Sequence, residues 1–503
     1  MFFRKGKSKE KENFSMPHTY IQSLSALMNN LETSADFVSV ECLDSCPFYL
    51  AYYTTLVNQD FIHRDILPFL VAKNLYKLEA IKRHLPIENM LITNNLKEIQ
   101  EKLLSGFLII YTKDKNQNSV LIIPSVPIES RQVTIPEVES VIVGPKEAFI
   151  ESLDTNLNMI RKRIPLIELR VKELKVGDIS KTKVAVLYIS GIANDKYLET
   201  TLQRINDIKF DQIIDSSYIS QMITDNQNSL FPQILDTERP DRVANFLSEG
   251  KIVVLVDGSP HALIVPINIF EFFSSSEDYF FNWPTASIFR LMRLVAAVLS
   301  ILATPIYIAI LTYHYEMIPE ELLTLLVASR NNVPFPPIVE VLILEFAIEL
   351  LRESAKRLPT KIGQTMGIVG GIVIGTAAVE AAITSNVLLI IVALAALASF
   401  TTPAFQMSNT VRLIRLPFLA SAQILGLLGI SICMAFLLGH LLRLSSLGCP
   451  YLEPVYPFRS QDMKDSLYRL PFQQQKTRPI FLRTKSSLRM ITNCIKGKSD
   501  IDE

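Results

Sequence analysis

Four long apolar runs in the second half of this 503-residue chain limit what it can fold into. The first, LVAAVLSILATPIYIAILTYHY at residues 294–315, carries no formal charge. The other three are residues 362–379, residues 381–411, with a predicted break near Pro403, and residues 416–442. About 20 apolar residues cross a hydrocarbon core of about 30 Å, whereas buried helices of soluble proteins have shorter runs. The pattern predicts an integral membrane protein with an all-α polytopic domain of four spans.

A fifth apolar segment, residues 337–351, carries Glu340, Glu345 and Glu349. Carboxylates at membrane depth usually face water, a partner or a pore. The segment is therefore either a charged re-entrant helix or an amphipathic helix that lies in the interface. We take Glu345 and Glu349 as candidate pore or gating residues. Glu380, which closes the second run, is a third candidate, with contact to lipid headgroups as its alternative.

Small residues recur along the second run. Gly363, Gly367, Gly371 and Gly375 are spaced every four residues, as in ridges that let membrane helices approach closely. The candidate helix-packing ridge serves contacts within one subunit or between subunits. Four spans place the basic carboxyl-terminal tail on the same side as the amino-terminal half, which agrees with the rule that positive charge stays on the cytoplasmic side. They also place the basic residues 352–361 on the opposite side, which disagrees with that rule.

The amino-terminal half has the pattern of a soluble α/β fold. Apolar strands are predicted at residues 183–189 and 251–256, with a helix at 195–207 between them. A strand–turn–strand unit at residues 106–124 resembles the one at 250–266, so we expect two related subdomains. The predicted order is a basic polar tail (1–18), soluble subdomain 1 (19–145), a connecting helix and strand (146–177), soluble subdomain 2 (178–282), the membrane domain (283–445) and a basic tail (446–503).

Composition and motifs argue against several functions. Lysine and arginine number 50 and aspartate and glutamate 50, so net charge indicates no nucleic-acid partner. The sequence contains no phosphate-binding loop, nucleophile elbow, zinc-protease motif or dinucleotide fingerprint. We therefore expect that the chain is not an enzyme and binds no cofactor. Cys42 and Cys46 would be half a zinc site without a second pair, so no metal is expected. The start of the chain has no apolar run behind its basic residues, so the soluble half is expected in the cytoplasm.

Motifs from about residue 141 onward resemble the A subunit of the GerA family of spore germinant receptors. The resemblance covers roughly residues 140–475. It rests on a set of short motifs, among them Gly144-Pro145-Lys146-Glu147-Ala148-Phe149, Thr237-Glu238-Arg239-Pro240-Asp241, Val256-Asp257-Gly258-Ser259-Pro260, Glu277-Asp278-Tyr279, Ala328-Ser329-Arg330, Val333-Pro334-Phe335-Pro336 and Gly448-Cys449-Pro450-Tyr451-Leu452.

The resemblance implies a receptor in the inner membrane of a bacterial endospore. The expected partners are a transporter-like B subunit, which binds the nutrient, a C-type lipoprotein subunit and membrane lipid. Further copies of the chain would form a homo-oligomer, with a pentamer as the candidate state. The A subunit is then expected to form a cation channel that opens on nutrient binding. The alternative is a non-conducting scaffold or signal-relay subunit of the same complex. A secondary transporter fits less well, because there are few spans and no inverted repeat.

Overall fold

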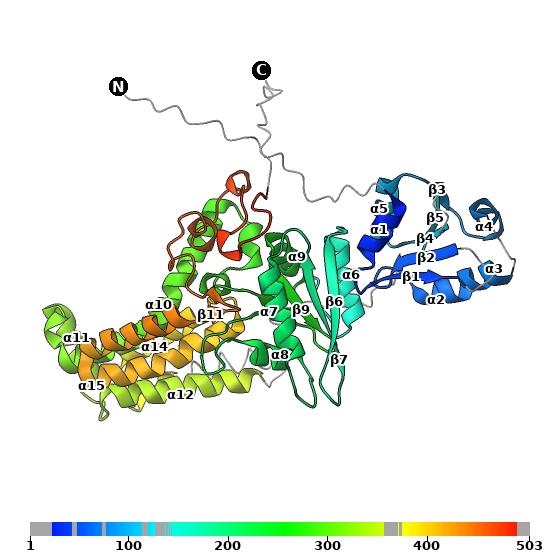
Figure 1. Ribbon diagram of the computed structural model, residues 1–503. Coiled ribbons are helices and arrows are strands. Elements are labelled where there is room, and N and C mark those ends of the chain that lie inside the picture. The colour runs from blue at the N-terminus through cyan, green and yellow to red at the C-terminus, as the bar shows by residue number, and fades with distance from the viewer. Residues whose placement is uncertain are drawn as a thin grey trace, which may run out of the picture. The chain divides into compact units, whose positions relative to one another are not determined.

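A computed structural model describes residues 23–42, 48–72, 77–112, 119–125, 136, 139, 141, 143–356, 371 and 375–489 (Figure 1). The chain divides into two compact units. The first comprises Met1–Thr224, Asp236–Pro266 and Leu470–Glu503, and the second comprises Asp225–Leu235 and Ile267–Arg469.

The first unit begins with an antiparallel sheet between two helical layers. Its strands are β1 (Phe37–Glu41), β2 (Phe48–Tyr53), β3 (Leu91–Thr93), β4 (Phe107–Thr112) and β5 (Val120–Pro124), in the order β1-β2-β4-β5-β3. Alternate strand residues point to opposite faces, so the sheet builds two hydrophobic cores. One core includes α1 (Leu24–Leu31) and α5 (Leu96–Leu104), and the other includes α2 (Gln59–Phe61), η1 (Ile62–Ile66), α3 (Leu67–Ala72) and α4 (Leu78–His84).

A second five-stranded sheet has the same topology. Its strands are β6 (Leu169–Val176), β7 (Thr182–Ile189), β8 (Leu235–Thr237), β9 (Ile252–Val256) and β10 (Ala262–Val265), in the order β6-β7-β9-β10-β8. Every residue of β9 and β10 is buried, so both faces are covered. The helices around it are α6 (Leu153–Arg163), α7 (Asp195–Asn206), α8 (Ser216–Ile223) and α9 (Pro240–Glu249). The predicted α/β class and the two related subdomains are confirmed.

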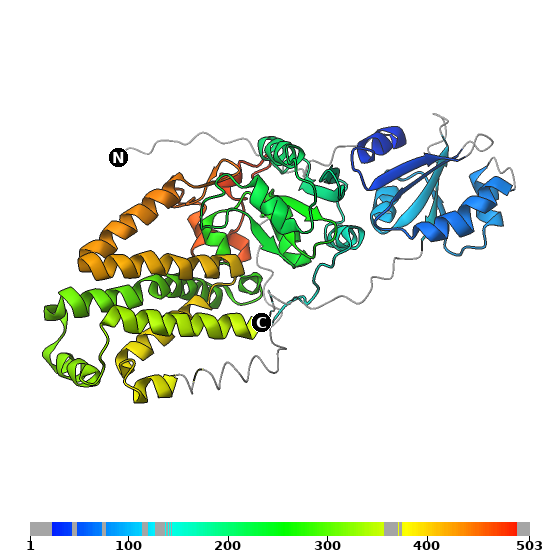
Figure 2. The same ribbon diagram turned by 90° about the horizontal axis from the view of Figure 1, so that it is seen from below.

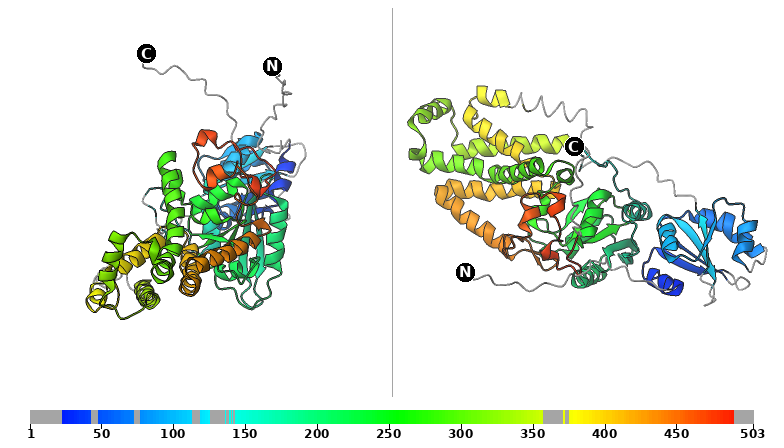
Figure 3. Two further views of the ribbon diagram at one scale, coloured as in Figure 1. Left: turned by 90° about the vertical axis from the view of Figure 1, so that its left-hand side faces the viewer. Right: turned by 90° about the horizontal axis from the view of Figure 1, so that it is seen from above.

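The second unit is mainly helical, and its green to orange helices lie side by side (Figures 2 and 3). Its main helices are α10 (Trp283–Tyr313), α11 (Glu320–Arg330), α12 (Pro337–Lys356), α14 (Asn386–Ser399) and α15 (Phe405–Arg443). Among the described residues, α10 and α15 are long and apolar enough to cross a membrane. The predicted helical second half is confirmed. Short elements before and after the helices are η2 (Ile269–Phe272), η3 (Ser276–Tyr279), β11 (Ser445–Ser446), β12 (Cys449–Pro450) and α16 (Met463–Ser466).

Helix α15 folds back on itself at Gly426. This residue has φ 62° and ψ −139°, a conformation that glycine adopts without steric cost. A Cβ atom added at Gly429 would lie 2.8 Å from the carbonyl carbon of Ser421 and closer still to its oxygen. In a straight helix, residues eight apart are separated by about 12 Å, so the chain must double back. The Tyr313 hydroxyl donates one hydrogen bond that is shared between the backbone oxygens of Gln423 and Ile424, where the first limb ends.

The helix boundaries differ from those of the apolar runs on which the predicted spans rest. The fourth run was expected at residues 416–442, but α15 begins at Phe405 and is divided at Gly426. Helix α14 ends at Ser399, and Pro403 lies in the turn that follows, as predicted. The early start of α15 places Arg412 and Arg415 inside a helix, where carboxylates from α12 pair with them. Most of the second run, residues 362–379, lies outside the described residues.

Candidate functional site

Arg415 joins four helices of the second unit. Its guanidinium is buried and pairs with the Glu345 carboxylate of α12. Nη2 of the same side chain donates to the Ser300 hydroxyl of α10 at 2.7 Å and to the Ala395 carbonyl of α14 at 3.2 Å. Because an isolated buried charge is costly, each of the two groups gains from a partner of opposite charge. Glu345, predicted as a pore residue, is therefore neutralised within its own protomer.

Glu349 lies one helical turn beyond Glu345 and has two arginine neighbours. Its carboxylate is 3.6 Å from Arg352 Nη1 and 3.7 Å from Arg412 Nη1. Helices α12 and α15 thus form a ladder of two charge layers, Glu345 with Arg415 and Glu349 with Arg412. Glutamates four apart and arginines three apart each occupy one helix face. This complementary spacing is the sequence signal by which Arg412 and Arg415 could have been found.

Glu340, the first carboxylate of α12, is a structural anchor that was not among the predicted site residues. It is buried and lies 2.9 Å from Arg330 Nη2 of α11. It also accepts a hydrogen bond from the Ser385 backbone amide, at 3.2 Å, just before α14 begins. These contacts hold α12 among α11 and α14. These contacts do not distinguish a re-entrant helix from one that lies in the interface, so both arrangements of residues 337–351 stay predictions.

The remaining predicted residues are not brought together with this ladder. Glu380 is exposed at the end of a helical segment, and no described residue forms a hydrogen bond or ion pair with its carboxylate. Gly363 and Gly367 lie outside the described residues. A Cβ at Gly371 would meet nothing within 4 Å, whereas one at Gly375 would lie 3.7 Å from the Leu389 side chain of α14. Of the ridge, only Gly375 is seen against another helix.

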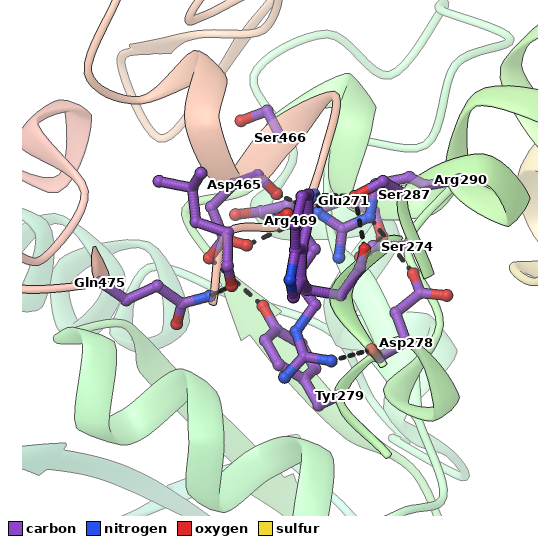
Figure 4. Close-up of polar contacts among 12 residues, drawn as sticks. Glu271, Ser274, Asp278, Tyr279, Ser287, Arg290, Asp465, Ser466, Arg469 and Gln475 are labelled. Atoms are coloured by element: carbon purple, nitrogen blue, oxygen red, sulfur yellow. Dashed lines mark hydrogen bonds and ion pairs between the residues drawn. The ribbon is translucent and has the colours of Figure 1, made fainter. Parts of the chain in front are cut away.

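A buried polar cluster lies at the start of α10 (Figure 4). The Asp278 carboxylate accepts a hydrogen bond from Arg290 Nε at 3.2 Å and also pairs with Arg293. Arg469 Nη1 donates to the Asp278 backbone oxygen at 2.7 Å, and the Tyr279 hydroxyl donates to Asp465 at 3.3 Å. The cluster ties the first long helix to η3 and to the segment around α16.

In the first unit, a buried ion pair joins the two sheets. Arg161 of α6 forms two hydrogen bonds with the Asp36 carboxylate, at 2.7 and 2.8 Å, and both side chains are almost fully buried. The guanidinium lies 4.5 Å from the Tyr53 ring centroid. Burial raises the pKa of Tyr53 to about 12, although the positive charge of Arg161 opposes this shift. Side chains from both subdomains thus share one desolvated site.

No cluster of three or more histidine, cysteine, aspartate or glutamate side chains that could hold a metal ion occurs within the described part of the chain. Cys42 is buried, and Cys46 lies outside the described residues. The polar arrangements that the described residues form in the second unit are ion pairs between helices and between a helix and its flanking segments.

The family model "Bacillus/Clostridium GerA spore germination protein" matches residues 25–481. This chain belongs to the GerA family. It is 48% identical to spore germination protein GerQA of Bacillus cereus, over 97% of this chain and 99% of that protein. It is 44% identical to spore germination protein GerIA of Bacillus cereus, over 96% of this chain and 73% of that protein. The match to the crystal structure of the amino-terminal domain of the GerK3 A subunit from Bacillus megaterium has 29% identity, covers 48% of this chain and 92% of that chain, and has a TM-score of 0.35, too low for a structural argument.

The predicted resemblance to the GerA-family A subunit is confirmed. The chain is an A subunit of a spore germination receptor, and such subunits are membrane-associated. Several residues of the motifs on which the resemblance rests form buried ion pairs. Asp278 is at the centre of the polar cluster at the start of α10. In the first unit, Arg239 pairs with Asp241 at 2.7 Å, and the nearby Arg242 pairs with Glu139 at 2.6 Å. Burial also raises the pKa of the neighbouring Asp236 carboxyl.

Proposed function

We propose that several copies of this GerA-family chain form a cation channel in the spore inner membrane. The channel opens when a transporter-like B subunit of the same receptor binds a nutrient, and a C-type lipoprotein subunit completes the complex. The soluble half lies in the cytoplasm, on the spore core side. The chain itself has no catalytic activity and acts by a shift between closed and open states.

The observation that carries this proposal is the acidic helix α12 inside a bundle of apolar helices. Carboxylates at this depth are costly, and their retention indicates a pathway for charge or a tie between helices. In the described conformation, Glu345 and Glu349 face arginines, so the negative charge that would favour cations is compensated. We assign this arrangement to the closed state. Opening then requires that at least one layer of the ladder separate, or that Glu380 provide the charge.

Replacement of the candidate carboxylates tests the channel. We expect Glu345→Gln, Glu349→Gln or Glu380→Gln to change nutrient-triggered potassium release from spores by about tenfold in at least one case, because a neutral amide removes a full charge from the ion pathway. Release is measured as ion flux after nutrient addition, with receptor levels checked by immunoblot. Glu321→Gln, an exposed substitution on α11, is the matched control and should leave the rate unchanged. Unchanged release in all three variants at normal protein levels would reject acidic selectivity.

A non-conducting relay is the second candidate, and the compensated charges of α12 favour it. In that case the polar cluster at the start of α10 would transmit movement between α10 and the segment around α16, and no pore would form. Conductance of the purified subunit in planar bilayers separates the two functions. Cation current that is altered by the glutamate variants supports the channel, whereas silence of the subunit with and without its partners supports the relay.

A further inference from the structure

Two cationic side chains from the end of α12 lie on the turn between α14 and α15. The Arg352 guanidinium carbon is 4.2 Å from the ring centroid of Phe400, and its Nη2 is 3.4 Å from the Ser399 hydroxyl. Lys356 Nζ is 5.3 Å from the ring centroid of Phe405, the first residue of α15. The last two turns of α12 therefore cover the start of α15.

This turn has several hydrogen-bond donors without acceptors among the described residues. Helix α15 starts after Ala404, whose side chain cannot cap it, so the first amides of the helix lack intrahelical partners. The Arg352 side chain is only 9% exposed, yet its Nε has no hydrogen-bond partner and its Nη1 has only Glu349 at 3.6 Å. Thr402 is 6% exposed, and its hydroxyl also has no partner. An oxyanion would satisfy donors of each kind.

The charge around the turn is also unbalanced. Arg352, Lys356 and Arg412 contribute three positive charges, and Glu349 and Glu353 contribute two negative ones. Among the described residues one positive charge is left over, and the start of α15 adds the partial positive charge of a helix dipole. A ligand with a single negative charge would neutralise the site.

Exposed aromatic rings indicate where that ligand comes from. Phe400 is 61% exposed and Phe405 is 49% exposed, beside the cations, one at the end of the apolar helix α14 and the other at the start of the long apolar helix α15. Exposed apolar rings beside cationic and unpaired donors match a molecule with a phosphate and acyl chains. We propose that Arg352, Lys356, Thr402 and the first turn of α15 bind the headgroup phosphate of an anionic phospholipid. This inference goes beyond the proposed channel, and its test measures lipid binding rather than conduction.

Thermal unfolding of the full-length chain in a zwitterionic detergent tests the site. Short-chain phosphatidylglycerol, short-chain phosphatidylcholine and inorganic phosphate are each titrated, and the apparent Tm is recorded. We expect phosphatidylglycerol to raise the Tm in a saturable way and the other two to have little effect at equal concentration. Arg352→Gln should weaken the apparent affinity about tenfold or more, because it removes charge-assisted hydrogen bonds. Arg64→Gln, which changes an exposed arginine of the first unit, should bind as the parent does.

Each other outcome overturns the proposal. Equal effects of phosphatidylcholine and phosphatidylglycerol would remove the role of net charge, and an equal effect of inorganic phosphate would make the site one for a soluble anion. If Arg352→Gln does not fold, Lys356→Gln decides, because this lysine is 41% exposed and its replacement should preserve the fold. Unchanged phosphatidylglycerol affinity in the folded variants rejects the site. None of these results depends on conductance, so the channel proposal stands or falls separately.

Discussion

Gly429→Ala is expected to prevent the fold-back of α15 and to remove most folded protein from the membrane. The added methyl group would press against the backbone of Ser421, which cannot rotate away as a side chain can. Overpacking against flexible neighbours costs about 1–3 kcal/mol, and a backbone obstacle should exceed about 3 kcal/mol. The measurements are receptor abundance in isolated membranes and the apparent Tm of the protein in detergent.

Gly439→Ala is the matched control for that experiment. Gly439 lies in the second limb of the same helix, and a Cβ there would meet nothing within 4 Å. This substitution should be neutral or stabilise the helix by up to about 1 kcal/mol, since alanine has the higher helix propensity. If the two alanine variants have the same abundance and Tm, the close approach of the two limbs is wrong.

Arg161→Ala is expected to destabilise the first unit by about 3–5 kcal/mol, because it leaves the Asp36 carboxylate buried without its partner. The loss should be largest where the two sheets meet. Hydrogen exchange of the full-length protein should show faster exchange in β1 and α6 than in the parent.

The exposed pair Arg64–Asp65 provides the comparison for this prediction. Its arginine side chain is 80% exposed, so Arg64→Ala should change stability by less than about 1 kcal/mol. Replacement of both buried partners, Arg161→Met with Asp36→Leu, should recover much of the stability, because no uncompensated charge remains. A small effect of Arg161→Ala with unchanged exchange in both elements would show that the sheets do not depend on this pair.

Periodicity predicted the parts of the fold that local sequence controls. Strands at residues 183–189 and 251–256, the helix at 195–207 and the repeated strand–turn–strand units all follow from alternation, helical spacing and turn residues. The pairing order of the sheets was not predicted, because it depends on contacts between distant segments. Their common order gives the internal similarity a structural basis.

The helical unit was harder to predict, because hydropathy treats a charge as the end of a run. Arg412 and Arg415 therefore separated two predicted spans, although each is part of α15 and pairs with α12. A charge that is compensated across helices leaves no signal within either run alone. The conformation of Gly426 was also not evident, because glycine is common in membrane helices and the reversal of the chain is seen only in its three-dimensional contacts, such as that at Gly429.

The reversal of α15 also bears on where the chain enters and leaves the helical unit. Ser287, near the start of α10, is hydrogen-bonded to Arg469, 3.1 Å away, and the Thr410 hydroxyl near the start of α15 binds the Leu230 carbonyl at 2.7 Å. His440, near the end of α15, lies 2.9 Å from the Ser229 hydroxyl. The chain therefore leaves the helical unit at the end where it entered, so the four spans predicted from the sequence, an even number, agree with this arrangement. A reporter fused after residue 443 and one fused before residue 283 should then be accessible from the same compartment.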